Sequence, residues 1–165
     1  MSKATMKLNN FCIWFVLCIC MVCAVSCDKN EVYYSYHELK NGEWSKFDTL
    51  KFDIDSSLVA PNANYKITVE LSINNNYSYR NIWLYAQDNI SDSTFLNYSQ
   101  QYTLADEYGK WYGSGFGAIY QISLNYKHAV RFNEKRDYCI KLLHGMRDEP
   151  LKNIEKVGIK IEKEE

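Results

Sequence analysis

One cysteine near the start of the chain has the surroundings of an acylation site. Cys27 follows an uncharged apolar run, 11–25, and stands directly after the small residue Ser26, and two lysines precede the run. This layout is typical of an export signal, and a cysteine directly after the cleavage site is the residue that receives lipid in bacterial lipoproteins. We therefore expect 1–26 to be a cleaved lipoprotein signal peptide and the sulfur of Cys27 to carry the lipid.

Two other interpretations of this segment stay open. A membrane-spanning helix needs about 20 apolar residues, whereas the run 11–25 has 15. Ordinary secretory cleavage without lipid would also suit the small residues Ala24 and Ser26, and lipoprotein signals favour leucine at position 24. We favour lipidation. Stable anchoring takes two or more acyl chains, which lipoprotein modification supplies, palmitate among them.

The remaining cysteines are consistent with this division of the chain. Four lie inside the apolar run and leave with it: Cys12, Cys18, Cys20 and Cys23. Cys139 is then the only thiol left in the mature domain besides Cys27, so no internal disulfide is available. A lone thiol in an oxidising compartment is most simply a buried residue, and we expect Cys139 in the core of a strand.

Two further patterns suggest chemistry but have simpler structural explanations. The glycine-rich run 113–117 resembles a phosphate loop, yet such a loop opens a helix, and here an alternating strand follows. A turn or bulge beside Trp111 is the better interpretation. Asp53 and Asp55 lie on one side of a strand and could bind calcium or act in glycoside hydrolysis. Such pairs are usually the solvated face of a strand.

The sequence offers no combination of residues that predicts an enzyme. His37, His128 and His144 are scattered and lack metal-ligand spacing, so we predict no metal site. No Gly-x-Ser-x-Gly nucleophile elbow is present either. We therefore predict no catalytic residue, no cofactor and no enzymatic activity.

Aromatic residues are the more informative group. Trp44, Trp83, Trp111 and all 14 tyrosines follow the signal segment. Most would fill a β core and its cross-strand pairs. However, 14 tyrosines are more than a small core can hide, so some must face water, a protein partner or a sugar.

Size and charge describe one domain of ordinary composition. Removing 26 of 165 residues leaves 139, which is a typical single domain. The removed segment holds two lysines and no acids, so the net charge changes from −1 to −3. This mild value gives no basic patch for nucleic acid, and we predict none as a partner.

Alternation of apolar and polar residues predicts an all-β fold. Strands are expected at 50–54, 65–74, 82–85, 94–104, 119–126, 138–142 and 157–161. Turn residues separate them, as at Asn41-Gly42 and Asn74-Asn75-Asn76. Seven or more short strands at this spacing favour an antiparallel β-sandwich, jelly-roll or immunoglobulin-like. One helical turn is expected at 148–155, with Pro150 near its start.

The motifs of the second half of the chain resemble a known family. They comprise Tyr102-x-Leu104-Ala105-Asp106, Gly109-Lys110-Trp111-x-Gly113-x-Gly115-x-Gly117 and Gly145-Met146-Arg147-Asp148-x-x-Leu151-x-x-Ile154-x-x-Val157-Gly158. Together with Gly42-x-Trp44 and Asn75-x-Tyr77-x-Tyr79-x-Asn81-x-Trp83, they resemble the gliding motility-associated lipoprotein GldH family. Ser78 and Asn153 depart from the family pattern, which has proline and glycine there; asparagine tolerates the positive φ that a glycine would supply.

The resemblance implies a domain organisation and a role. It covers 44–165, after a segment 27–43 with the lipidated cysteine, a tether and a first strand. It implies an outer-membrane lipoprotein that is a structural or interaction component of the gliding machinery or the associated secretion machinery, with other envelope proteins as partners. Trp111, Met146, Arg147 and Asp148 are the residues expected to form a structural or partner-binding motif, and Arg147 could brace Asp148 or Asp106. The alternative is a surface lipoprotein that binds glycans through its aromatics.

Overall fold

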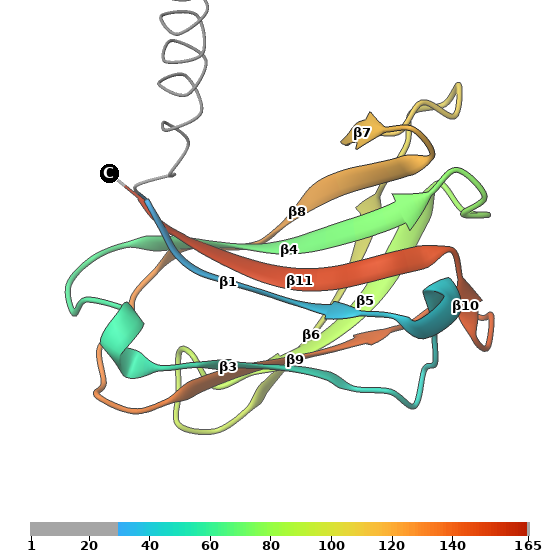
Figure 1. Cartoon of the computed structure of the whole chain (residues 1–165). Coiled ribbons are helices and arrows are strands. Elements are labelled where there is room, and N and C mark those ends of the chain that lie inside the picture. Colours follow the sequence, from blue (N-terminus) through green and yellow to red (C-terminus); the bar gives the residue numbers. More distant parts are fainter. Residues whose placement is uncertain (1–29, 165) are drawn as a thin grey trace, which may run out of the picture.

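The computed structural model describes residues 30–164, which fold into strands joined by short loops (Figure 1). In chain order the elements are β1 (Glu31–Glu38), η1 (Lys40–Gly42), β2 (Glu43–Trp44), β3 (Leu50–Ile54), η2 (Ser56–Leu58), β4 (Tyr65–Asn74), β5 (Asn81–Asp88), β6 (Leu96–Thr103), β7 (Ser114–Phe116), β8 (Ile119–Val130), β9 (Tyr138–His144), β10 (Leu151–Lys152) and β11 (Ile154–Lys163). The two η elements are single 3₁₀ turns. The expected acylation site, Cys27, and the expected signal peptide, 1–26, lie outside the described residues.

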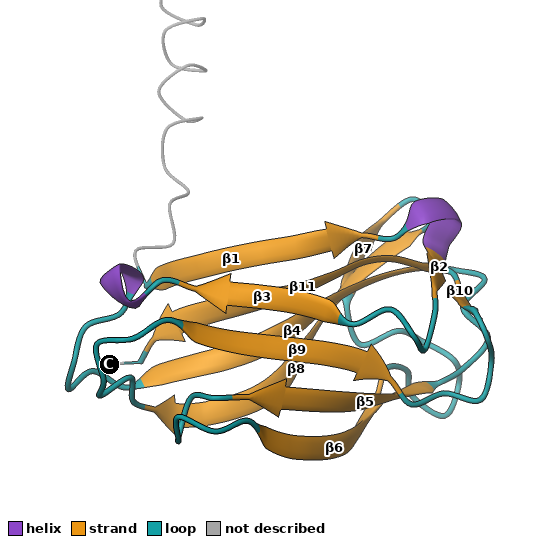
Figure 2. Ribbon diagram, turned by 90° about the horizontal axis from the view of Figure 1, so that it is seen from below, coloured by secondary structure: helices purple, strands orange, loops and turns teal. Residues whose placement is uncertain are grey.

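Two antiparallel sheets pack face to face. One has the strand order β1-β11-β4-β8-β7 and the other β3-β9-β5-β6, while β2 and β10 pair separately at one end. Apart from the β5–β6 hairpin, each long strand crosses to the opposite sheet from its predecessor (Figure 2). This is the jelly-roll arrangement of eight long strands. The predicted antiparallel sandwich is confirmed, and the order of its strands is that of a jelly roll and not of an immunoglobulin domain.

The core lies between the sheets and follows from the period of two. Every odd-numbered residue of β4 from Tyr65 to Ile73 is buried, and Ile159 of β11 is buried beside them. Phe52 and Ile54 of β3 enter the same core from the other sheet. Because successive side chains of a strand point to opposite faces, the intervening residues Lys51 and Asp53 face solvent.

The tether segment and the last strand are paired in the structure. β1 pairs with β11 along its length, from Glu31 opposite Glu162 to Glu38 opposite Lys156. The first strand is therefore part of the sandwich. This pairing brings the start of β1 and the end of β11 to the same end of the molecule (Figure 1). We call it the anchor end.

β5 is central in its sheet, as its apolar sequence predicts, but only one of its faces is covered. It lies between β9 and β6. Ile82 and Leu84 are buried, whereas Trp83 and Tyr85 are 40% and 51% exposed on the outer face. Two large aromatic side chains therefore lie on the open surface of a sheet.

The predicted helical turn at 148–155 is wrong. This segment is extended: Leu151 pairs with Trp44, and β11 begins at Ile154. Leu151 and Ile154 are both fully buried, and their burial outweighs the local helix signal at Pro150. Asn153 between them has a φ of 68°, which is the left-handed conformation expected for a residue in place of glycine.

Cys139 lies where the sequence predicts. It is a free, buried thiol in β9. Burial raises the pKa of this thiol, and hydrogen bonding to Asp53 adds to the rise. Because the thiolate is the reactive form of cysteine, the environment makes Cys139 unreactive.

Candidate interaction surface

Three loops that carry the sequence motifs meet at one end of the sandwich, opposite the anchor end. They are 75–80, 104–113 and 145–153 (Figure 1). The backbone N–H of Leu104 donates to the carbonyl of Arg80 at 2.7 Å, which joins the first two loops. The side-chain amide of Asn153 donates to the carbonyl of Asn76 at 2.9 Å, which joins the third. We call this the loop end.

Trp111 fixes the longest of these loops to the sandwich. Its ring is half-buried and lies 6.2 Å from the ring of Tyr77 and 6.4 Å from that of Tyr120, measured between centroids. Its backbone forms a bridge with Ala105. The carboxylate of Asp106 accepts the N–H groups of two residues of the turn, each at 2.9 Å. Trp111 is thus a structural residue, and the polypeptide before it is held in a defined turn.

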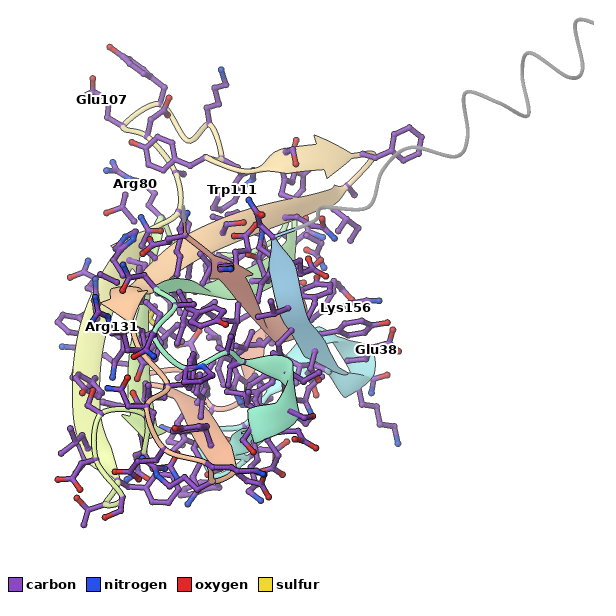
Figure 3. All side chains as sticks on the ribbon, turned by 90° about the vertical axis from the view of Figure 1, so that its left-hand side faces the viewer. Glu38, Arg80, Glu107, Trp111, Arg131 and Lys156 are labelled. Carbon is purple, nitrogen blue, oxygen red and sulfur yellow. The ribbon has the colours of Figure 1, made fainter. Side chains whose placement is uncertain are left out.

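The segment on both sides of Trp111, residues 106–117, projects from the body of the sandwich. Figure 3 shows Glu107 at the tip of the loop and Trp111 near its base. Tyr108, Tyr112 and Phe116 are 87%, 62% and 96% exposed. We call residues 106–117 the projecting arm. It presents three aromatic side chains to solvent.

The glycines of the arm allow β7 to lie close to β8. A Cβ atom at Gly113 would lie 2.0 Å from the carbonyl oxygen of Gln121, and one at Gly115 would lie 2.7 Å from that of Ile119. Gly117 has a φ of 66° in the turn between the two strands. A strand follows the run and not a helix, so the structure shows the turn expected from the sequence and no phosphate loop.

The Gly145-Met146 pair packs on β5. The N–H of Gly145 donates to the carbonyl of Trp83 at 2.7 Å, and the N–H of Trp83 lies 3.3 Å from the sulfur of Met146. A Cβ atom at Gly145 would lie 2.7 Å from Cε2 of Tyr85. The absence of that atom lets the tyrosine ring lie directly on the backbone. Met146 is therefore a packing residue that supports the edge of the exposed aromatic pair.

Arg147 and Asp148 lie at the surface of the loop end. Arg147 is exposed, and its guanidinium forms no hydrogen bond or ion pair with any residue of 30–164, so the expected brace to Asp148 or Asp106 is not formed. The hydroxyl of Tyr79 hydrogen-bonds to Asp148, and this bond raises the pKa of Tyr79. Asp148 therefore interacts with a tyrosine, while Arg147 presents a free cation.

A shallow hollow adjoins these residues. Its volume is about 340 Å³ and its lining includes Ser78, Tyr79, Asp148 and Asn153. Both positions that depart from the family pattern thus face the same depression. Glu149 closes one side, where its carboxylate accepts from the Ser45 hydroxyl at 2.6 Å and from the N–H of residue 46 at 2.8 Å. These bonds hold the pKa of Glu149 below its ordinary value.

The acidic pair considered for catalysis has structural partners. Asp53 forms an ion pair with Lys51 at 3.0 Å. Asp55 accepts the N–H of Ser57 at 2.7 Å and thereby caps a 3₁₀ turn. These interactions lower the pKa of both carboxyl groups. Each carboxylate is occupied by a neighbour in its own segment.

The histidines are dispersed, as their spacing predicts. His37 lies against Phe52 and within 2.9 Å of the carbonyl of Lys51, and His128 lies 3.4 Å from Glu164. His144 is buried beside Trp44, with ring centroids 5.3 Å apart. Within residues 30–164, no three His, Cys, Asp or Glu side chains are grouped so that they could hold a metal ion.

A buried ion pair at the anchor end was missed from the sequence. Asp88 is fully buried, and its carboxylate lies 2.7 Å from Nζ of Lys127 and accepts the hydroxyl of Tyr126. The ammonium group also lies 4.0 Å from the ring centroid of Tyr98. Burial, and then the bond to Asp88, raises the pKa of Tyr126. The alternation of the strand does indicate a buried position, because Asp88 falls in phase with the buried residues Ile82, Leu84 and Ala86.

A larger hollow of about 520 Å³ adjoins this pair. Lys127, His128 and Arg131 contribute to its lining. It lies at the anchor end, away from the loops that carry the motifs (Figure 3 labels Arg131). In the described range 30–164, no helix is long and apolar enough to cross a bilayer.

These features define a class of protein: a jelly-roll module with three loops gathered at one end and with exposed aromatic side chains on its loops and sheets. The chain belongs to the GldH lipoprotein family, whose sequence profile matches residues 31–161. It is thus a member of a family of membrane-anchored lipoproteins associated with gliding motility.

Two curated relatives align with nearly the whole chain. It is similar to the gliding motility lipoprotein GldH homolog of Christiangramia forsetii, with 28% identity over 156 residues, covering 90% of this chain and 94% of the relative. It is also similar to the gliding motility lipoprotein GldH of Flavobacterium johnsoniae, with 28% identity over 158 residues, covering 91% of this chain and 96% of the relative.

Proposed function

We propose that this chain is an outer-membrane lipoprotein, acylated on Cys27, that acts by binding other envelope proteins of the gliding machinery or the associated secretion machinery. It acts as a structural component and not as an enzyme. The family membership supports the role in motility. The projecting arm supports a docking function, because it exposes three aromatic side chains that contribute nothing to the core.

The position of the arm relative to the anchor strengthens this proposal. Only three residues lie between Cys27 and Glu31. The four residue steps from the cysteine to β1 would therefore hold the anchor end within about 14 Å of the lipid headgroups. β1 has eight residues and, at about 3.3 Å per residue, spans about 26 Å. The projecting arm at the opposite end is then directed away from that membrane, where another envelope protein can reach it.

Charge and apolar surface at the loop end suit a protein partner. Tyrosine, tryptophan and arginine dominate the binding energy of protein interfaces. Tyr108 and the unpaired Arg147 are exposed there, and Phe116 is exposed farther along the arm.

The test is a double variant of the arm, Tyr108→Ala with Phe116→Ala, expressed as the full chain in its native cells. Because both side chains are almost fully exposed, we expect unchanged folding and membrane content. We expect the motility or secretion proteins that co-purify with the wild type from detergent extracts to decrease about tenfold or more. Surface spreading of cells should decrease with them where the host glides.

The matched control is Tyr34→Ala with Tyr36→Ala, two side chains that are each 48% exposed on β1. This variant should retain the partners. Equal recovery of motility and secretion proteins with the arm variant and with the wild type would contradict docking through the arm.

A further inference from the structure

The outer face of β5 and β6 is an uncharged surface. The strands pair in register, with Trp83 opposite Gln101 and Tyr85 opposite Ser99. Residues directly opposite each other share a face. The outward positions of the two strands are Asn81, Trp83, Tyr85, Gln87, Asn97, Ser99, Gln101 and Thr103. We call these eight residues the amide–aromatic face; Figure 2 views the molecule from the side of this sheet.

The composition of this face is unusual because it contains no charged residue. It holds four side-chain amides, two hydroxyl groups and two aromatic rings. About 25–35% of the surface residues of a soluble domain carry charge, so eight adjacent positions would ordinarily include about two or three charged residues. None is charged here. Apart from Asn81, which is half-buried, all of them are exposed.

The opposite sheet shows that this neutrality is not general. Tyr34 and Tyr36 of β1 are also exposed, but their neighbours are charged. Nζ of Lys156 lies 4.5 Å from the ring centroid of Tyr36 and 2.8 Å from the carboxylate of Glu38 (Figure 3). Glu70 shares a shallow depression with the two tyrosines. The outer face of the β5–β6 pair therefore differs from that of β1, and charged residues of its own sheet begin at Lys141 of β9, which lies opposite Gln87.

The aromatic pair is held in a fixed arrangement. Trp83 and Tyr85 are two residues apart on a strand that is hydrogen-bonded on both sides, so their positions are about 7 Å apart on a rigid element. The tyrosine ring rests on the backbone of Gly145, and Met146 contacts the backbone of Trp83. One side of the tyrosine ring is thus supported by protein and the other is open to solvent.

The polar groups beside the rings are also positioned. Nε2 of Gln87 donates to Oδ1 of Asn97 at 2.8 Å, which orients both amides and leaves their other donors and acceptors outward. The Gln101 amide lies opposite Trp83. An amide both donates and accepts hydrogen bonds, so it suits a ligand whose groups do the same.

We propose that the amide–aromatic face is a binding site for a neutral glycan, whose rings stack on Trp83 and Tyr85 and whose hydroxyl groups bond to the flanking amides. A sugar ring has apolar C–H faces for the aromatics and hydroxyl groups at its rim for amides and hydroxyls. A neutral ligand matches a neutral surface, because nothing on it would require a compensating charge. The site is separate from the projecting arm and does not depend on docking through it.

The experiment measures binding of the full chain, purified in detergent, to immobilised neutral polysaccharides: hydroxyethyl cellulose, mannan, xylan and dextran. Alginate serves as the charged comparison. We expect the wild type to bind at least one neutral polysaccharide and not alginate, and added salt to leave this binding unchanged because no charges are screened. Trp83→Ala with Tyr85→Ala should weaken the binding about tenfold or more.

Two variants make the result specific to this face. Gln101→Glu introduces a charge beside Trp83 without removing a ring and should also weaken binding, whereas Tyr34→Ala with Tyr36→Ala should not. Circular dichroism verifies that each variant is folded. If the wild type binds none of the neutral polysaccharides, or if the β1 variant loses binding as much as the Trp83 and Tyr85 variant, the proposal is wrong. Neither outcome bears on the arm, whose variant has its own readout.

Discussion

At the scale of single residues, His144 is a neutral base in an apolar setting. Its side chain is buried at the end of β9 against the ring of Trp44. Burial lowers the pKa of His144 below the ordinary value of 6.5, because an imidazolium there would lose its hydration. The negative charges of Glu149 and Asp148 act in the opposite direction, and Lys46 assists the lowering.

This environment makes stability depend on pH. The unfolded chain takes up a proton at His144 at a higher pH than the folded chain does, so its contribution to the free energy of unfolding is complete above 6.5 and is lost as pH falls. Between about pH 7.5 and about pH 5.5, we expect urea unfolding to show a decrease of up to about 1.4 kcal/mol per pH unit below 6.5. His144→Phe, which keeps the ring contact but does not titrate, should flatten this dependence.

The exposed His128 provides the control for this prediction. It lies 3.4 Å from Glu164 and is not part of the core. His128→Gln should therefore keep the loss of stability on acidification that the wild type shows. An unchanged pH profile in His144→Phe would mean that another group carries the dependence.

At the scale of elements, Asn153 determines how β10 connects to β11. Its φ of 68° lies in the left-handed region, which costs a residue with a Cβ atom about 1–2 kcal/mol unless it is compensated. Its side-chain amide compensates by donating to the carbonyl of Asn76. The same asparagine thus makes the turn and ties two loops of the loop end together.

Two substitutions separate these contributions. Asn153→Gly and Asn153→Ala both remove the amide bond, at a cost of about 0.5–1.5 kcal/mol, but only alanine adds backbone strain. We expect urea unfolding to rank the wild type above Asn153→Gly and to place Asn153→Ala about 1 kcal/mol lower still. Equal stabilities of the two variants would show that the strain at this turn is absorbed elsewhere.

The sequence predicted the elements better than it predicted their contacts. Period-two alternation located the strands and the buried face of β4, because alternation reports directly which side of a strand is covered. It could not choose between sandwich topologies, which depend on pairings such as β1 with β11 across most of the chain. The helical turn at 148–155 failed for the same reason, since the partner of Leu151 is the distant Trp44.

The candidate sites also depend on contacts between distant segments, which the sequence pattern does not predict. Composition predicted that some aromatics must be exposed, but not that Trp83 and Tyr85 would share a face with four amides, because that face exists only through the pairing of β5 with β6. Trp111 and Met146 were assigned to a motif from the sequence, and the structure places both in packing contacts. Of that motif, Arg147 keeps a free side chain.

At the scale of the whole molecule, anchor and binding surfaces are arranged along one axis. The chain enters the sandwich at the anchor end, beside the last residues of β11. The projecting arm lies at the other end, and the amide–aromatic face lies along the side between them. A lipid on Cys27 would therefore set the arm at a distance from the bilayer and leave the side face parallel to the long axis, open to glycan or solvent.

This arrangement depends on the lipid, which gives the last prediction. We expect cells supplied with radiolabelled palmitate to label the wild-type chain, and Cys27→Ala to abolish the label while the domain, whose described strands begin only at Glu31, stays folded. Cys23→Ala is the matched control, because that thiol leaves with the signal peptide and its loss should not affect labelling. Mass spectrometry of the wild type should find an acylated chain that begins at Cys27. A labelled Cys27→Ala protein, or a native chain that retains residues 1–26, would remove the basis for directing the arm away from the membrane.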